Sequence, residues 1–239
     1  MKIKAMDLIK HIDRASMGGL INEAVFGDGM LFALTDESRS IVSICSNGIA
    51  DDVTGDIGIF NLKLFINAVK YAQKNIFTNG KDIQMDIADN MLIFGNGKDK
   101  FTFPIGSPDR ISTTVDNAQE VIEKIIEGEA TTVTLTPSVI GKCQKVIRMI
   151  CPAKCVFIVK PGSITLLVGD EKEYNATVDL GATNGKGTFK LVVKPNFLSK
   201  VLDVLPTDKN TTLEIRAALP LIFKINYYIF ILASMEVDQ

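Results

Sequence analysis

The stretch that decides this fold reads Asn61-Leu-Lys-Leu-Phe-Ile-Asn-Ala-Val-Lys-Tyr-Ala-Gln-Lys74. At helical spacing, one narrow stripe carries only cations and an amide. Its members are Lys63, Asn67, Lys70 and Lys74, and the apolar residues opposite are Leu64, Phe65, Ala68, Val69 and Ala72. No acidic residue lies at i±4 to neutralise the stripe. We therefore expect one side of this helix to pack into a core and the other to face a polyanion.

The composition limits which classes of protein are possible. A chain of 239 residues, 46% of them hydrophobic, can form one large domain or two small ones. Its formal net charge of −2 argues against a protein that coats nucleic acid with its whole surface. A locally basic surface on an otherwise acidic protein stays compatible with these values.

The sequence offers no pattern for catalysis, metal binding or a cofactor. The cysteines lack the paired C-x-x-C spacing of a zinc site; they are Cys45, Cys143, Cys151 and Cys155. Three of them fall in one apolar segment, where we expect reduced core thiols. The phosphate loop GxxxxGK[ST] is absent, and the single histidine, His11, lacks the partner pattern of a triad or metal cluster. We expect a non-enzyme without metal or cofactor.

One apolar segment, residues 217–235, is nearly long enough to span a membrane. Pro220, Lys224 and Asn226 interrupt it, and β-branched and aromatic residues dominate. Two buried strands joined by a tight turn near residues 224–226 fit better. No signal peptide pattern opens the chain, so we expect a cytoplasmic protein that does not cross a membrane.

The second half of the chain repeats the order of elements in the first. Helices are expected at residues 5–16, 62–74, 137–150 and 196–205, among many short strands. The local match is best where Phe60–Val69 lies over Val193–Leu202, which aligns Phe65 with Leu198. We expect an N-terminal domain at 1–106, a connector at 107–130 with a short helix at 118–127, and a C-terminal domain at 131–239.

The other helices also gather cations on their polar faces. In the first helix they are Lys10, His11 and Arg14, on a side shared with Asp7, and in the third they are Lys142, Lys145 and Arg148. The fourth face is weaker, because Lys200 is its only basic residue and lies beside Asp203, although Lys194 precedes the helix. Ordinary solvation explains any one such face. Several together can neutralise phosphates and release counterions. Lysine-rich stripes suit contact with the phosphate backbone rather than readout of bases.

Short strings elsewhere resemble the DNA polymerase sliding clamps of the eukaryotic, archaeal and tailed-phage kind. Residues Ile57-Gly-Ile-Phe-Asn-Leu-Lys-Leu-Phe-Ile66, followed by Asp86-Ile-Ala-Asp89 and Phe103-Pro104, are similar to the first domain of phage clamps. Residues Ala217-Ala-Leu-Pro-Leu-Ile-Phe223, then Tyr227-Tyr228, Leu232-Ala233 and Glu236-Val-Asp238, resemble the end of proliferating cell nuclear antigen. The run Phe32-Ala-Leu-Thr-Asp-Glu-Ser-Arg-Ser-Ile41 resembles the lining of that family's client pocket.

This resemblance implies an α+β fold with two similar domains per chain, each with antiparallel sheets and two helices. The helices would line the hole of a trimeric ring, with the sheets outside. The implied partners are duplex DNA without sequence preference, a DNA polymerase, a clamp loader and further copies of the chain. Edge strands that pair between subunits would hide otherwise sticky sheet edges.

The resemblance also implies a client pocket. Carried over by matched position, it involves Leu34, Arg39, Ile111, Val115, Pro220, Leu221 and Ala233. Such a groove would anchor apolar side chains of a client peptide. The alternative is that Leu34, Pro220 and Leu221 simply belong to the core.

Two other functions remain open at this point. One is a monomeric or dimeric processivity factor of the same fold that binds DNA without encircling it. The other is an enzyme or small-molecule binder on a duplicated α+β scaffold, which would require a pocket with convergent polar groups.

Overall fold

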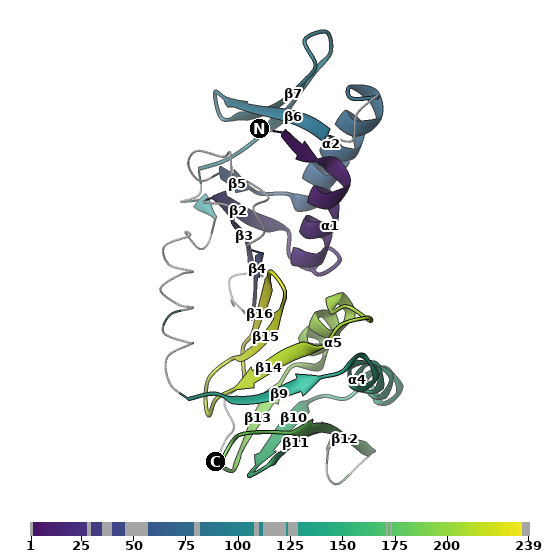
Figure 1. The fold of residues 1–239 in the computed structure, drawn as a ribbon, viewed down its shortest axis with the longest axis vertical. Helices are drawn as coiled ribbons and strands as arrows, with labels where there is room; N and C mark the ends of the chain where they lie inside the picture. The colour runs from purple at the N-terminus through teal and green to yellow at the C-terminus, as the bar shows by residue number, and fades with distance from the viewer. Residues whose placement is uncertain are drawn as a thin grey trace. The chain divides into compact units, whose positions relative to one another are not determined.

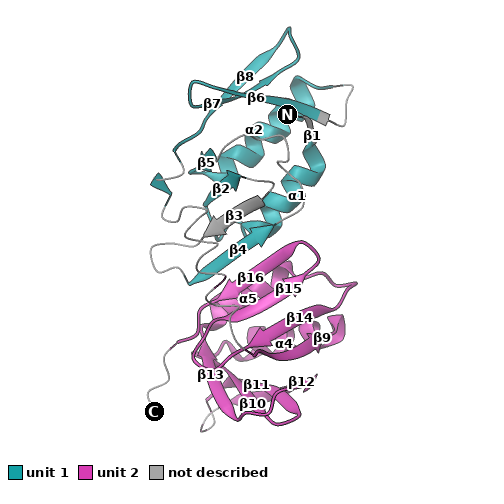
Figure 2. Ribbon diagram, turned by 60° about the vertical axis from the view of Figure 1, so that its left-hand side comes forward, with its two compact units in different colours: residues 1–121 teal, residues 122–239 magenta. Residues whose placement is uncertain are grey.

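The computed structural model describes residues 2–27, 30–34, 40–45, 57–78, 82–107, 110–111, 123, 129–170, 172 and 174–235. The chain forms two compact units, residues 1–121 and residues 122–239 (Figure 2). Each unit contains two described helices among antiparallel strands, so the predicted α+β class is confirmed.

Unit 1 combines a helix pair with two sets of antiparallel strands. Its elements are β1 (Lys2–Lys4), α1 (Ala5–Ala15), β2 (Glu23–Gly27), β3 (Met30–Leu34), β4 (Ile41–Cys45), β5 (Ile57–Ile59), α2 (Leu62–Asn75), β6 (Asp82–Ala88), β7 (Met91–Gly95) and β8 (Lys100–Pro104). One sheet has the order β1-β6-β7-β8. The other set pairs in the order β5-β2-β3-β4. The short β1 is a strand that the sequence did not predict.

Unit 2 repeats this plan. Its elements are β9 (Thr131–Leu135), α4 (Pro137–Ile150), β10 (Cys155–Lys160), β11 (Ser163–Gly169), β12 (Asn175–Ala182), β13 (Phe189–Val193), α5 (Pro195–Val204), β14 (Thr211–Ile215), β15 (Leu221–Ile225) and β16 (Tyr228–Leu232). Its strands pair in the orders β13-β10-β11-β12 and β9-β14-β15-β16.

Both units therefore run through strand, helix, four strands, helix and three strands (Figure 1). The pairing orders also correspond strand by strand, since β1-β6-β7-β8 matches β9-β14-β15-β16 and β5-β2-β3-β4 matches β13-β10-β11-β12. The predicted duplication is confirmed. The predicted connector at 107–130 and its helix at 118–127 fall almost wholly outside the described residues, so the proposed domain boundaries stay a prediction.

The second helix of each unit buries its apolar face as its spacing predicts. In α2, Phe65 is 2% exposed and its ring centroid lies 5.8 Å from that of Phe26 and 5.4 Å from that of Phe103. At the matching position of α5, Leu198 is fully buried. The prediction for Leu64 was wrong, because this side chain is 56% exposed. It sits at the margin of the apolar face, where no described element covers it fully.

The apolar segment at residues 217–235 forms strands, as predicted. β15 and β16 pair with Ile225 opposite Tyr228, so only two residues form the turn. Asn226 takes the left-handed conformation that such a turn requires, with φ of 48°. No helix in the described part of the chain is long and apolar enough to cross a membrane.

The cysteines are free thiols, and three of them belong to the core. Burial raises the pKa of both Cys143 and Cys155 to about 12, which keeps these thiols protonated. Cys151 departs from the prediction, because it is exposed just after α4.

Candidate nucleic-acid interface

The stripe on α2 is held toward solvent by the packing of its opposite face. The helix starts at a fixed point, because the Asn61 side-chain oxygen accepts a hydrogen bond of 2.9 Å from the Leu64 backbone N–H. Burial of Phe65 and Val69 then leaves the stripe exposed; its members are Lys63, Asn67, Lys70 and Lys74. Within the described ranges, no carboxylate forms an ion pair with these three lysines.

The cations of α1 are placed less uniformly. Lys10 is exposed and Arg14 is half-buried. His11 is also half-buried, and its Nδ1 lies 3.6 Å from the Sγ of Cys45, a fully buried residue of β4. Burial is the main cause that lowers the His11 pKa. Because the ring faces β4, we leave His11 out of the proposed DNA-binding surface.

In α4, Lys142 and Lys145 are exposed, whereas Arg148 is engaged with the neighbouring helix. Arg148 Nη2 donates to Asp203 Oδ1 of α5 at 2.6 Å. The pair joins residues 55 positions apart, so helix periodicity could not reveal it.

The face of α5 is the least basic. Lys200 is exposed on the same helix that carries Asp203. Lys194, just before the helix, places its Nζ 5.5 Å from the centroid of the Phe197 ring, a cation–π distance. Both lysines stay candidates for contact with DNA.

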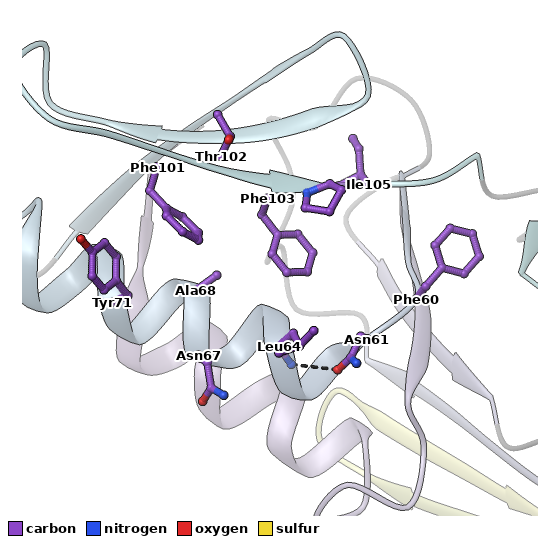
Figure 3. Close-up of a pocket in the computed structure, with 11 residues that line it drawn as sticks. Phe60, Asn61, Leu64, Asn67, Ala68, Tyr71, Phe101, Thr102, Phe103 and Ile105 are labelled. Atoms are coloured by element: carbon purple, nitrogen blue, oxygen red, sulfur yellow. Dashed lines mark hydrogen bonds between the residues drawn. The ribbon is translucent and has the colours of Figure 1, made fainter.

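An apolar groove lies between α2 and β8 in unit 1, and it was not predicted. Its volume is about 640 Å³, and Figure 3 shows Phe101 and Phe103 pointing from β8 toward the helix. Its walls come from Phe60, Asn61, Leu64, Asn67, Ala68, Tyr71 and residues 101–105. The exposure of Leu64 and Tyr71, at 56% and 51%, makes this an unusually apolar surface. The alternating aromatics of β8 were the signal in the sequence that could have indicated it.

The sheet edges differ in how they are protected. The edge at β9 is blunted, because Asn184 Oδ1 accepts hydrogen bonds from the backbone and the hydroxyl of Thr132. The edge at β13 is bridged by Met235, whose backbone N–H donates to the Val192 carbonyl at 2.7 Å. By contrast, β8 and β12 each end a sheet. On the outer side of each, the described part of the chain supplies no further strand. An open edge of this kind presents unpaired backbone N–H and C=O groups with which another strand can pair.

The residues of the predicted client pocket are placed only in part. Arg39, Val115 and the Leu34 side chain lie outside the described residues. Ile111 is 2% exposed and packs closely on Gly58 in unit 1. In unit 2, Leu221 is fully buried, and Pro220 and Ala233 are half-buried at the same end of the β15–β16 hairpin. The pocket stays a prediction.

Among the described residues, no three His, Cys, Asp or Glu side chains gather where they could hold a metal ion. The basic stripe and the apolar groove are two described surfaces whose chemistry suits binding.

No protein-family model and no curated protein sequence matches the chain. Solved structures of bacterial sliding clamps do match. The DNA polymerase sliding clamp from Bacillus subtilis matches with a TM-score of 0.73 at 12% identity, over 100% of this chain and 65% of that one. The clamp from Caulobacter crescentus gives 0.73 at 15% identity, over 99% and 65%. The H. pylori beta clamp in complex with 5-chloroisatin gives 0.73 at 11% identity, over 100% and 64%.

This chain therefore spans just under two thirds of the length of these three relatives. The strings in the sequence resemble eukaryotic, archaeal and tailed-phage clamps, whereas these three matching structures are bacterial clamps. At such low identity the match concerns architecture. The chain has the fold of the DNA polymerase sliding clamps.

Proposed function

We propose that this protein is a DNA polymerase processivity factor, a sliding clamp whose chains close into a ring around duplex DNA. The polymerase and a clamp loader would bind its outer surface. The observation that carries the proposal is the exposed α2 stripe, free of described acidic partners, on a clamp fold whose net charge is −2.

The chemistry of the stripe suits a surface that slides. Lys63, Lys70 and Lys74 can each neutralise a phosphate, and Lys142 and Lys145 of α4 add to them. Lysine is a flexible point charge that does not select a base. Weak contacts are sufficient, because a closed ring keeps the protein on DNA by topology rather than by affinity.

Ring closure can be built from the open edges at β8 and β12. We propose that β8 of one copy pairs antiparallel with β12 of the next, with Thr102 opposite Thr177. In this register Lys100 meets Asp179, and both are exposed. The inward-facing Phe101 meets Val178, which also faces inward and is 7% exposed, so both strands keep their apolar side on one face.

The same register accounts for the apolar groove. It places Tyr174, which is 91% exposed beside β12, opposite Ile105 at the Phe60 end of the groove. A tyrosine ring inserted there would cover Phe60 and Leu64, which are 38% and 56% exposed. Three copies joined in this way form the trimer that the resemblance implies. The client pocket at Leu34, Arg39, Ile111, Val115, Pro220, Leu221 and Ala233 remains part of the proposal for polymerase and loader.

The stripe is tested by the double variant Lys70→Glu/Lys74→Glu. Its affinity for a labelled duplex should fall at least tenfold at low salt, and the salt slope should become shallower by about 1.8, for two lost phosphate contacts. Lys160→Glu/Lys186→Glu makes the same change of charge on two exposed residues of unit 2 that do not belong to the stripe. If this control lowers the affinity equally, net charge rather than the stripe explains the binding.

Ring closure is tested by solution mass and cross-linking. Sedimentation should give three times the 26.1 kDa chain mass. Oxidation of Thr102→Cys/Thr177→Cys should give a ladder that ends at three chains, and Tyr174→Ala should weaken the assembly. A monomer at micromolar concentration would contradict the ring and favour the open processivity factor of the same fold.

A further inference from the structure

The helix pair of unit 2 contains a polar cluster that the proposed function does not use. Asp203 lies in the last turn of α5, which carries no basic residue. Its Oδ1 accepts from Arg148 Nη2 at 2.6 Å and from Gln144 Nε2 at 3.2 Å. The same Gln144 amide nitrogen donates to the Leu202 carbonyl at 3.0 Å. Figure 1 shows α4 and α5 side by side, and the cluster joins them at this end.

The position of Asp203 is unusual on electrostatic grounds. The C-terminus of a helix carries partial negative charge, so an aspartate there is unfavourable unless a cation compensates. Arg148 supplies that cation from the neighbouring helix. The side chains are 62% and 33% exposed for Arg148 and Asp203, and an ion pair at such a surface contributes little to folding. Its main consequence is therefore the local potential.

The cluster competes with a phosphate for the same donor. Arginine binds phosphate through the planar fork that it also offers to a carboxylate. Arg148 belongs to the basic side of α4 with Lys142 and Lys145, so the acceptor at 2.6 Å occupies a group that DNA would otherwise contact. In α2 of unit 1, no described acid pairs with the lysine stripe.

We propose that Asp203 is an internal competitor for phosphate, which withholds Arg148 from DNA and sets the affinity of unit 2 below that of unit 1. Asp203 is a positioning residue, since it acts on DNA through Arg148. The proposal rests on the proposed function, because it assumes that these helix faces meet duplex DNA. Beyond that function, the proposal is that Asp203 lowers the chain's own affinity for DNA, which suits a protein that slides.

The test is a double-mutant cycle on the full chain, with affinity for a labelled duplex measured against salt. Asp203→Asn keeps an acceptor for Gln144 but removes the charge. It should raise affinity about threefold to tenfold at low salt and steepen the salt slope by about 0.9, for one added phosphate contact. Arg148→Gln alone should change affinity less than twofold. Arg148→Gln added to Asp203→Asn should abolish the gain.

Asp208→Asn is the matched control, since it removes one exposed acid five residues further along the chain. An equal gain from Asp208→Asn, or a gain from Asp203→Asn that survives Arg148→Gln, would overturn the proposal. If Asp203→Asn failed to fold, Asp203→Ser would carry the same expectations. Lys70→Glu/Lys74→Glu in the same assay distinguishes failure of the Asp203 proposal from failure of the proposed DNA-binding function. Loss of binding there with no gain from Asp203→Asn overturns this inference alone, whereas no loss there refutes the DNA-binding function itself.

Discussion

The two units share one order of elements and one order of strand pairing, yet their helix pairs present different surfaces. In unit 1, α2 exposes three lysines with no described acidic partner. In unit 2, α5 carries Lys200 beside Asp203, and Asp203 binds Arg148 of α4. Buried positions are constrained by packing in both copies, whereas exposed positions could diverge. A duplicated fold can thus keep one architecture while its two helix pairs present different charges at the surface.

The interiors differ as well. Unit 1 packs an aromatic cluster around Phe65, and unit 2 uses Leu198 at the matching position. Unit 2 in turn holds an almost buried charge cluster, in which Glu214 contacts Lys224 and Arg216. The two units thus reach stability by different means, and matched substitutions can separate them.

The largest effect is expected from truncating the matched core residues. Phe65→Ala should lower the free energy of unfolding of unit 1 by about 3–5 kcal/mol, and Leu198→Ala that of unit 2 by about 2–5 kcal/mol. Both side chains are buried among well-packed neighbours, so each change leaves a cavity. Amide hydrogen exchange during urea titration would assign each loss to its unit. Equal loss of protection in both units after Phe65→Ala would show that they unfold as one.

A somewhat smaller loss of stability, confined to unit 2, is expected from a substitution at Glu214. The Glu214 side chain is 12% exposed, and its Oε1 accepts a hydrogen bond from Lys224 Nζ at 2.5 Å. Its Oε2 lies 3.4 Å from Nη1 of Arg216, whose side chain is 7% exposed. Glu214→Gln removes the negative charge that compensates these cations, which should cost about 3 kcal/mol in unit 2. Asp170→Asn, in the solvent-exposed pair with Lys154, is the control and should hardly change stability. Equal effects from both variants would mean that the burial of Glu214 adds nothing.

Much of this architecture could be predicted from the chain itself. Periodicity placed α2 and α5, and it identified Phe65 and Leu198 as core residues. Periodicity wrongly assigned Leu64 to the buried face, because the spacing of apolar residues along a helix does not show where a neighbouring strand ceases to cover it. It also missed β1, because three residues are too few for an alternating pattern to be distinguished from chance.

The candidate site was less predictable, because it depends on contacts between distant segments. The α2 stripe could be predicted from one helix alone. The groove needs β8 opposite α2, and the bond between Arg148 and Asp203 needs α4 packed on α5. His11 was grouped with the cations of α1, but its approach to Cys45 could be seen only after β4 was placed beside that helix.

A modest effect is expected at the helix starts. Asn61 caps α2 through its side chain, whereas Lys194, at the same position before α5, makes no side-chain cap bond. Asn61→Ala should therefore lower stability by about 1 kcal/mol, and Lys194→Ala should leave it nearly unchanged. Thermal melting followed by circular dichroism would measure both. A larger loss from Lys194→Ala would mean that its contact with Phe197 matters more than a cap.

The smallest effect concerns pH and belongs to unit 1 alone, because His11 is the only histidine in the chain. Burial lowers the His11 pKa; the nearby carboxylate of Asp7 opposes this, and Arg14 and Lys10 add to it. The folded state then binds fewer protons than the unfolded state near pH 6.5, the ordinary pKa of a histidine. Stability contributed by the neutral ring is present above that pH, falls as the pH drops below it, and levels off below the lowered pKa.

The difference in unfolding free energy between the native chain and His11→Gln, followed from about pH 7.5 to about pH 5 in urea titrations, isolates this contribution from that of the carboxylates. We expect the native chain to lose more stability than the variant over this range, because only the native ring must be protonated against β4. The opposite trend, with the native chain gaining relative to His11→Gln on acidification, would mean that the protonated ring is favoured in the folded state. That result would mean that the protonated ring leaves Cys45, and it would return His11 to the cations of α1 that we propose for contact with DNA.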